Sequence, residues 1–291
     1  MKFRFDCFDC VFRQLRLLAA DAGKSDPERI RIMREMLLAF CERLDRATPP
    51  QLAEKFFGIA ARETGIADPF AEVKAKSTEI GLAMLPELRR LASAAPDPFA
   101  ASVLYAIGGN IIDYGVNPDF DIRKAEREIR AVVDLPCDRA ALAELRRRID
   151  AARSVLYMLD NCGEAAIDRL VIERYREKIT IGVRGRAIMN DITRAELAAS
   201  GLDFVPVVDT GCGIPGVSLG SCSREFLDVI NSVDLVIAKG QGNFESLEAD
   251  FRRPVFFLFR AKCKTVCAYL GGAAVNSLQI IGRNLEAFPL P

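Results

Sequence analysis

The sequence contains no histidine among its 291 residues. This absence excludes a Ser-His-Asp or Cys-His catalytic pair, a histidine general base and any histidine metal ligand. A metal site must therefore use oxygen donors or cysteine thiolates. Net charge is also absent, because 40 Lys and Arg residues balance 40 Asp and Glu residues. A neutral chain argues against broad electrostatic capture of nucleic acid or an anionic membrane, while leaving room for a local basic pocket.

Long apolar runs are missing as well. The longest uncharged stretch, residues 265–282, includes Asn276, Ser277 and Gln279, which makes it a poor membrane span. Charged residues interrupt every candidate signal-peptide core near the N-terminus. The nine cysteines are irregularly spaced, unlike those of a small secreted disulfide scaffold. We therefore expect a reduced, cytoplasmic globular protein that binds neither nucleic acid nor membrane.

The first half of the chain has the pattern of helices. Capping boxes at Ser25–Glu28 and Thr48–Gln51, each with proline at the first helical position, open two amphipathic runs. Apolar and aromatic residues around 5–15 predict an N-terminal helix packed into the body. Further helical patterns cover residues 70–93, 98–107, 121–133 and 140–152.

The second half changes to short apolar runs that alternate with helical stretches. The predicted strands are 155–159, 179–183, 204–208, 235–238 and 255–259, and the predicted helices are 165–175, 194–199, 224–232, 244–250 and 263–270. This alternation predicts an α/β fold with a mostly parallel sheet covered by helices on both faces. The pattern divides the chain into a helical part, 1–152, and an α/β part, 153–291. Because no Gly/Pro/Ser linker separates them, we expect them to pack as one compact unit.

Charged side chains follow every predicted strand, where open parallel sheets bind their ligands. The acidic ones are Asp160, Glu164, Asp191 and Asp209, and the basic ones are Arg184, Lys239, Arg260 and Lys262. Carboxylates with an amide oxygen suit a hard divalent cation. Basic side chains and glycine-rich turns suit a phosphate. Any single Asp or Asn is compatible with an ordinary helix N-cap, but the agreement among all the strand ends favours a site.

Other phosphate and nucleotide motifs fit poorly. The chain has no G-x-x-x-x-G-K-[ST] loop. The segment Gly240-Gln-Gly242 begins like a dinucleotide fingerprint, but Glu245 stands where the third glycine belongs. An aspartyl-phosphate phosphatase would have a second Asp two residues after Asp160, and Cys162 occupies that place. These departures argue against a P-loop, a dinucleotide site and a covalent Asp160 intermediate.

Six short motifs occur in a fixed order over nearly the whole chain. They are Cys7-Phe-Asp-Cys10 with Gln14; Asp68-Pro69-Phe70 with Lys74; Gly109-Asn110-Ile-Ile-Asp113-Tyr-Gly115; Asp160-Asn161-Cys-Gly163-Glu164; Asn190-Asp191-Ile-Thr193; and Lys239-Gly240-Gln-Gly242-Asn243. Together they resemble the metal-dependent damage-control phosphatase family, also called the acidic-residue-methyltransferase-like domain. The paired N-terminal cysteines resemble its mostly prokaryotic branch. The resemblance implies a helical part followed by a Rossmann-like three-layer α/β/α domain, and a divalent-metal phosphatase acting on small phosphometabolites such as sugar phosphates.

The resemblance also implies roles for individual residues. Its metal ligands carry over as Asp160, Asn161 and Asp191, which would hold Mn²⁺, Mg²⁺, Co²⁺ or Ni²⁺. We expect catalysis to depend on Asp160, Asp191, Glu164 and Lys239, with Glu164 or Asp209 orienting the water or acting as acid. For substrate or phosphate binding we expect Lys239, Gly240, Asn110, Asp113 and Arg184. Gln241 stands where some members have Asp, so an acid role there is in doubt.

Three alternatives remain open at this stage. One is a phosphosugar- or nucleotide-binding protein without turnover, and another is a thiol or zinc protein using Cys7 and Cys10. Methyl transfer to protein carboxylates ranks lowest, because no glycine-rich loop follows the first predicted strand. The cysteine pair itself fits two buried space-filling residues, a redox dithiol, or a metal or active-site lining; as a zinc site it would need Cys263 and Cys267 nearby. We expect a double alanine variant of the pair to lose modest stability and keep its activity.

Overall fold

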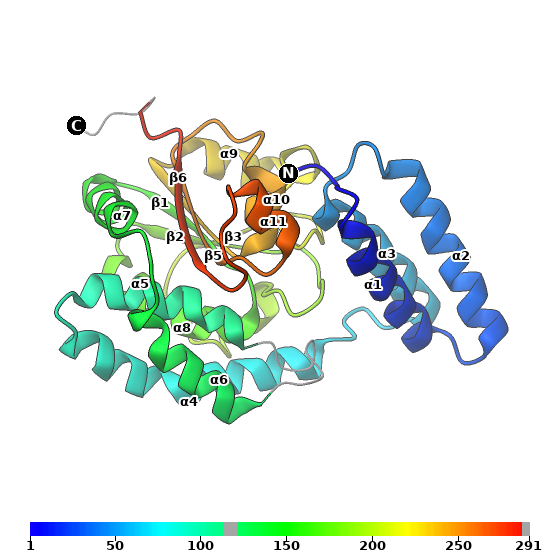
Figure 1. The fold of residues 1–291 in the computed structure, drawn as a ribbon, viewed down its shortest axis with the longest axis horizontal. Helices are drawn as coiled ribbons and strands as arrows, with labels where there is room; N and C mark the ends of the chain where they lie inside the picture. The colour runs from blue at the N-terminus through cyan, green and yellow to red at the C-terminus, as the bar shows by residue number, and fades with distance from the viewer. Residues whose placement is uncertain (113–120, 287–291) are drawn as a thin grey trace.

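A six-stranded sheet forms the centre of the computed structural model, which describes residues 1–112 and 121–286 (Figure 1). The strands are β1 (Val155–Met158), β2 (Ile179–Val183), β3 (Val207–Asp209), β4 (Leu235–Lys239), β5 (Val255–Arg260) and β6 (Leu278–Arg283). Their order is β3-β2-β1-β4-β5-β6, with β1 to β5 parallel and β6 antiparallel to β5. Strand order therefore reverses between β1 and β4, where open α/β sheets bind ligands.

Helices cover both faces of this sheet. One face packs against α4 (Ala71–Ala94), α5 (Pro98–Gly108), α6 (Ile122–Arg130), α7 (Arg139–Ala151) and α8 (Cys162–Ile172). The other face packs against α9 (Arg224–Ser232), α10 (Gln241–Leu247) and α11 (Lys264–Tyr269). Every residue of β1 and β4 is buried, which explains why these strands are uninterrupted apolar runs rather than alternating ones. The predicted three-layer α/β/α fold is confirmed.

A second core lies among the first three helices, drawn in blue in Figure 1. These are α1 (Cys7–Ala22), α2 (Asp26–Arg43) and α3 (Pro49–Thr64). The capping boxes at Ser25 and Thr48 are present, as predicted; Pro49 is the first residue of α3, whereas Pro27 is the second residue of α2. Ile188, from the loop after β2, is buried in this core and so ties the three-helix bundle to the sheet. The boundary between the core of the bundle and the core of the sheet falls between α3 and α4, because α4 to α7 pack into the core of the sheet.

Some predicted boundaries were wrong. The strand expected at 204–208 begins only at Val207, after Pro206, and the helix expected at 194–199 is a single 3-10 turn, Arg194–Glu196. Strand β6 was not predicted, because its polar residues and its place at the edge of the sheet hide it within a mixed sequence. None of the helices in residues 1–112 and 121–286 is both long and apolar enough to cross a membrane.

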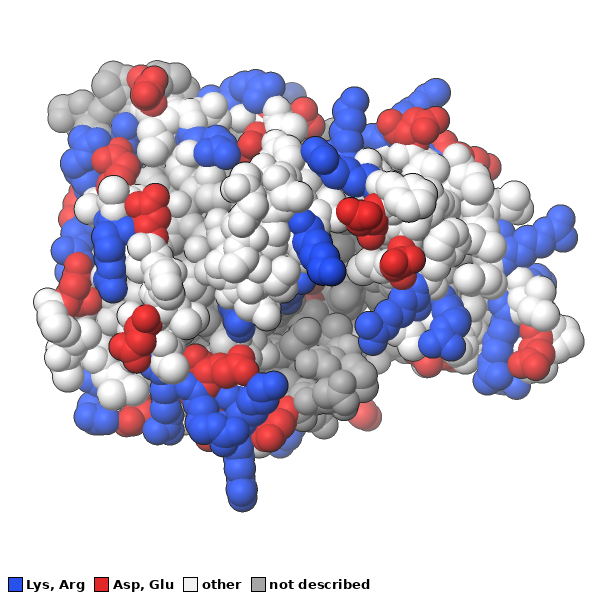
Figure 2. Space-filling view, viewed as in Figure 1, with Lys and Arg blue, Asp and Glu red and all other residues white. Residues whose placement is uncertain are grey.

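Charge is mixed over the surface. Figure 2 shows Lys and Arg interspersed with Asp and Glu on the viewed face. This agrees with the zero net charge of the sequence.

Candidate functional site

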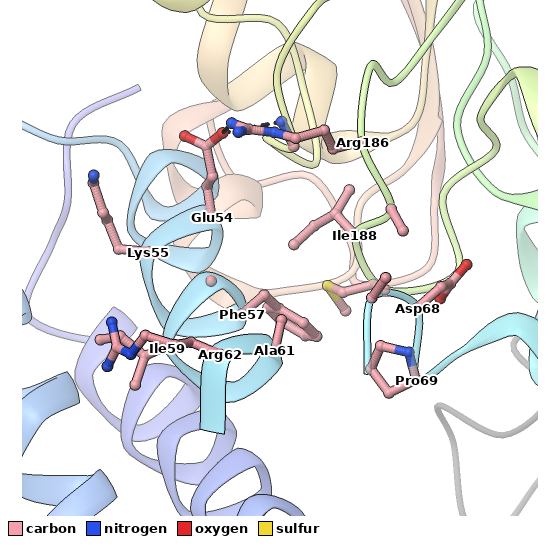
Figure 3. A pocket seen from close by; sticks show the side chains of 15 residues that line it. Glu54, Lys55, Phe57, Ile59, Ala61, Arg62, Asp68, Pro69, Arg186 and Ile188 are labelled. Carbon is pink, nitrogen blue, oxygen red and sulfur yellow. Dashed lines mark hydrogen bonds and ion pairs between the residues drawn. The ribbon is translucent and has the colours of Figure 1, made fainter. Parts of the chain in front are cut away.

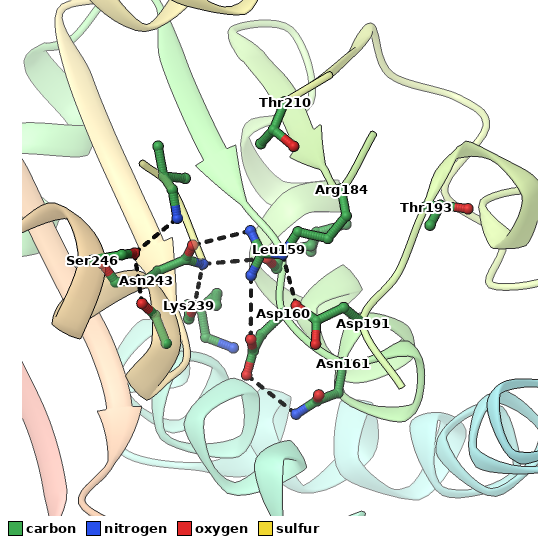
Figure 4. Close-up of polar contacts among 12 residues, drawn as sticks. Leu159, Asp160, Asn161, Arg184, Asp191, Thr193, Thr210, Lys239, Asn243 and Ser246 are labelled. Atoms are coloured by element: carbon green, nitrogen blue, oxygen red, sulfur yellow. Dashed lines mark hydrogen bonds and ion pairs between the residues drawn. The ribbon is translucent and has the colours of Figure 1, made fainter. Parts of the chain in front are cut away.

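Backbone hydrogen bonds hold the loop after β2 against the end of β1. The Ile192 amide donates to the Asp160 carbonyl at 2.9 Å, and the Cys162 amide donates to the Asn190 carbonyl at 3.0 Å. Asn161 and Asp191 are paired in an isolated bridge. The structure therefore brings together Asp160, Asn161 and Asp191 at the carboxyl edge of the sheet, as the sequence predicted (Figure 4).

The two carboxylates of this cluster are buried close to each other. Burial raises the pKa of Asp160 well above its usual range, and the charges of Asp191 and Glu164 raise it further. Burial likewise raises the pKa of Asp191, opposed by the Arg184 guanidinium. Asn161 occupies the N-cap position of α8, but its side chain makes no capping bond and instead donates to Asp160 Oδ2 at 3.2 Å. Helix capping alone therefore does not account for an asparagine at position 161.

Arg184 is a fully buried cation that faces the acids. Its Nε donates to Asp191 Oδ2 at 2.7 Å, its Nη1 to Asn243 Oδ1 at 3.0 Å, and its Nη2 to Asp160 Oδ1 at 3.5 Å (Figure 4). The guanidinium thus balances part of the negative charge of the cluster. The sequence also predicted that Arg184 binds a phosphate, and that contact remains a prediction.

Lys239, expected to bind phosphate, also lies in the interior. Its Nζ donates to Glu164 Oε1 at 2.5 Å, Asp168 Oδ1 at 2.6 Å and the Ala106 carbonyl at 2.9 Å. All three N–H groups of the ammonium therefore have protein acceptors, and the side chain is 0% exposed. A phosphate contact would have to replace one of these bonds, so the predicted contact remains a prediction.

Asn110 links the buried ions to the carboxylate cluster. Its Nδ2 donates to Glu164 Oε2 at 2.6 Å and to Asp160 Oδ2 at 3.1 Å. Its Oδ1 is buried without a hydrogen-bond partner in the described residues, so it offers one unsatisfied oxygen beside the site. Asp113, from the same motif, lies outside the described residues.

Gly240 is required for the close approach of two strand ends. Its φ is +81°, in the region that favours glycine. A Cβ at this position would lie 2.0 Å from Asp160 Oδ2. The predicted turn glycine therefore lies directly against the carboxylate cluster.

Lys262, which the sequence analysis placed at this edge without assigning it a role, also lies near the cluster. Its charge lowers the pKa of both Asp160 and Asp191, which places it near the cluster. It is exposed, and its ammonium has no ion pair or hydrogen bond within the described ranges. Its position after β5 placed it at the correct edge, but no motif singled it out.

Two other charged strand ends do not join the cluster. Asp209 pairs with the exposed Arg194 and accepts from the Gly211 amide, so it closes a turn. Arg260 donates to the Asn276 carbonyl at 3.3 Å. The expectation that Asp209 helps orient the water has no support from these contacts.

A cavity of about 420 Å³ adjoins the loop that carries Asp191 (Figure 3). The exposed Arg186, which pairs with Glu54 of α3 at 2.8 Å, lies on one wall. Phe57, Ile188 and Asp68 also line the cavity. The three-helix bundle thus supplies one side of a hollow near the carboxyl edge of the sheet.

A mostly parallel α/β sheet with carboxylates, amides and cations at its switch point defines a ligand-binding protein of the Rossmann-like class. The chain belongs to the damage-control phosphatase ARMT1-like domain family, whose match spans residues 4–278. It is 33% identical over 277 residues to a protein of Pyrococcus horikoshii named damage-control phosphatase, covering 93% of this chain and 94% of that one. A damage-control phosphatase of Archaeoglobus fulgidus is 32% identical over 229 residues, 76% of this chain and 77% of its own. The crystal structure of the P. horikoshii protein, described as a DUF89 family protein, has a TM-score of 0.85 at 32% identity and covers 98% of this chain and 100% of its own.

Proposed function

We propose that this protein is a divalent-metal-dependent phosphatase that hydrolyses small phosphorylated metabolites such as sugar phosphates. The observation that carries the proposal is the convergence of Asp160, Asn161 and Asp191 at the switch point of the sheet. Membership of a family whose relatives are named damage-control phosphatases supports it.

The donor set fits a hard divalent cation. Asp160 and Asp191 are buried acids with raised pKa values, and a divalent cation bound to them would favour their ionised forms. No three or more His, Cys, Asp or Glu side chains among the described residues lie together so as to hold an ion by themselves. Two carboxylates and the Asn161 amide would therefore leave positions for water and phosphate oxygens, which is the coordination that Mg²⁺ and Mn²⁺ accept. When bound, such an ion supplies Lewis-acid polarisation and an acidified water.

The chain's own residues divide the remaining work. Arg184 fixes the two carboxylates, while Lys239 holds Glu164 and through it the Asn110 amide. Lys262 lies beside the cluster and its ammonium has no partner in residues 1–112 and 121–286, so we assign it to the incoming phosphate. Such charge neutralisation by positioned groups is the main requirement of phosphoryl transfer.

A phosphate-release screen over sugar phosphates, nucleotides and cofactor phosphates, with Mg²⁺, Mn²⁺, Co²⁺ or Ni²⁺, tests the proposal. We expect release that stops with a chelator and returns with metal. Asp191→Asn should lower metal-dependent activity on the order of 100-fold, because it removes a charged ligand while an amide can still accept from Arg184. Release that persists in the chelator and in Asp191→Asn would refute metal dependence. Ligand binding with no release under any metal would favour the binding-protein alternative.

A further inference from the structure

The N-terminal cysteine pair has no part in the proposed chemistry. Cys7 is half-buried and Cys10 is exposed, so the interpretation of the pair as two buried space-filling residues is wrong. Within residues 1–112 and 121–286, no group of three or more Cys, Asp or Glu side chains is placed to hold a metal ion, so the structure does not support a zinc site at the pair.

A second motif without a chemical role is Asp68-Pro69-Phe70 with Lys74. The structure places Lys74 in the first turns of α4, where its side chain is fully buried. An ammonium removed from water is costly unless acceptors replace the lost hydration. The Lys74 Nζ donates to Asp68 Oδ2 at 2.8 Å and to Glu196 Oε1 at 3.4 Å. The motif therefore forms a cluster of one cation and two acids.

Asp68 anchors one end of this cluster at the start of α4. It lies in residues 65–70, which connect the three-helix bundle to α4. Its Oδ1 accepts from the Phe70 amide at 2.9 Å, a local bond that fixes the turn before the helix. Asp68 also lines the cavity between the bundle and the loop after β2. The ammonium of Lys74 is thus tied to the connection between the two cores.

Glu196 ties the other end of the cluster to the loop that carries Asp191. Its Oε2 accepts from the Thr193 amide at 2.8 Å and from the Thr193 hydroxyl at 2.7 Å, while its Oε1 accepts from Lys74. Thr193 follows Asp191 by two residues and is paired with Arg184 in an isolated backbone bridge. Arg184 in turn donates to Asp191 Oδ2 at 2.7 Å. A movement of Glu196 would therefore reach both the backbone and the side-chain partner of Asp191.

The contact between Lys74 and the carboxylate cluster is indirect. Among the described residues, the acceptors of the Lys74 ammonium are Asp68 and Glu196, and none of the predicted metal ligands is one of them. Because Lys74 is fully buried, it also presents no surface to a substrate. Its influence on the site must pass through Glu196.

We propose that Lys74 is a positioning residue that holds Glu196, which through Thr193 sets where the Asp191 carboxylate lies. The inference rests on the proposed function, because it takes Asp191 to be a metal ligand. Residues that orient metal ligands without touching the ion contribute roughly 10- to 100-fold to metal affinity. A buried ion pair without this role would contribute to folding alone.

Mn²⁺ affinity of the full-length protein, measured from the electron paramagnetic resonance signal of the free ion, tests the inference. Thr193→Val removes the hydroxyl that donates to Glu196 but nearly preserves the side-chain shape, so we expect affinity to fall about tenfold or more. Thr193→Ser retains the hydroxyl and should bind Mn²⁺ nearly as the wild type does. Lys74→Met should weaken binding by a similar factor to Thr193→Val. Lys76→Met, which changes an exposed lysine of α4 paired with Glu79 at 2.9 Å, is the matched control and should bind Mn²⁺ normally.

The double variant Lys74→Met/Thr193→Val distinguishes one chain of contacts from two separate defects. If both residues act through Glu196, the double variant should lose little more Mn²⁺ affinity than either single variant. At saturating Mn²⁺, both single variants should lower kcat and leave KM for the phosphorylated substrate nearly unchanged, because neither side chain touches the substrate. A merely structural ion pair would lower the denaturant midpoint and leave Mn²⁺ affinity and kcat of the folded protein unchanged.

Wild-type Mn²⁺ affinity in folded Lys74→Met and Thr193→Val would overturn the positioning role. If Lys74→Met does not fold, the comparison of Thr193→Val with Thr193→Ser decides. Mn²⁺ binding is measured without substrate, so it is independent of phosphate release. A wild type that binds Mn²⁺ more tightly than these variants but releases no phosphate would support the positioning role and contradict the proposed function.

Discussion

At the scale of single residues, the two most buried cations of the site each neutralise a pair of acidic side chains. Lys239 lies between Glu164 and Asp168, and Arg184 lies between Asp160 and Asp191. Breaking such a buried pair leaves an unbalanced charge in the interior. Lys262 is exposed and has no ion pair with any described residue, so its loss should affect substrate binding rather than folding.

Lys239→Met and Lys262→Met should therefore behave differently. We expect Lys239→Met to lower the free energy of unfolding by about 3–5 kcal/mol, because Glu164 and Asp168 lose their counterion. Lys262→Met should leave stability nearly unchanged and raise KM for the phosphorylated substrate roughly tenfold, the value of one charge-assisted hydrogen bond. Denaturant titrations and steady-state kinetics on both variants distinguish the roles. Unchanged kinetics in Lys262→Met would remove Lys262 from the site.

Asp168 should make stability depend on pH. Burial raises its pKa to about 7, with Lys239 opposing the shift, and its Oδ2 has no hydrogen-bond partner in the described residues. An unfolded Asp has a pKa near 3.9, so between about pH 4 and pH 7 the folded state holds a proton that the unfolded state has released. This contribution to stability is complete below about pH 4 and is lost as the pH rises through 7.

Asp168→Asn removes that titration. Its free energy of unfolding should therefore fall less between pH 5 and pH 8 than that of the wild type, although the variant is less stable overall. Denaturant unfolding at several pH values measures the slope. Glu79→Gln, an exposed change on α4, should follow the wild type. Equal slopes for Asp168→Asn and the wild type would show that Asp168 is already ionised at pH 5.

The sequence placed the carboxylates and both Arg184 and Lys239 at the strand ends, but it did not predict that the two cations are buried and paired with acids. Asp160 and Asp191 could be predicted because the ends of parallel strands share one edge. The burial of Lys239 could not be predicted, because one of its acceptors, Asp168, belongs to no motif and another is the Ala106 carbonyl of a distant helix. Asn110 was found only through the family resemblance, since pattern alone indicates a helix end.

At the scale of elements, the position of α8 is set by an unusually close contact with α4. A Cβ on Gly81 would lie 2.3 Å from the Gly163 carbonyl oxygen and 2.9 Å from Ala166 Cβ. Because Asn161 stands at the N-cap position of α8, this contact also helps to place the carboxylate cluster. The sequence predicted both helices, but their spacing depends on which glycines face each other.

Gly81→Ala should therefore destabilise the protein by about 1–3 kcal/mol, the usual cost of overpacking. It should also lower phosphatase activity, because α8 must move away from α4. Gly58→Ala is the matched control: it is an exposed glycine of α3 with nothing within 4 Å of an added Cβ. It should stabilise the helix by roughly 0.5–1 kcal/mol. A Gly81→Ala variant as stable as the wild type would show that the two helices separate easily.

At the scale of the whole molecule, the change in sequence pattern and the division in packing occur at different places. The pattern changes from helical to α/β near residue 152, but α4 to α7 share their core with the sheet. The core of α1 to α3 is separate and includes Ile188 from the sheet domain. Sequence periodicity reports which elements form, whereas packing depends on which apolar faces meet.

Two fragments should reveal this division. Residues 153–291 lack α4 to α7 and would expose the apolar face formed by residues such as Tyr157, Ile181 and Ile237, so we expect aggregation without a cooperative transition.

Residues 66–291 keep both covering layers and should unfold cooperatively. They should nevertheless lose most phosphatase activity, because Ile188 loses the bundle that supports the loop leading to Asp191. Circular dichroism melts, size-exclusion chromatography and phosphate release measure these outcomes. Cooperative unfolding of 153–291 would support the predicted boundary near residue 152, and full activity of 66–291 would show that the bundle does not support the site.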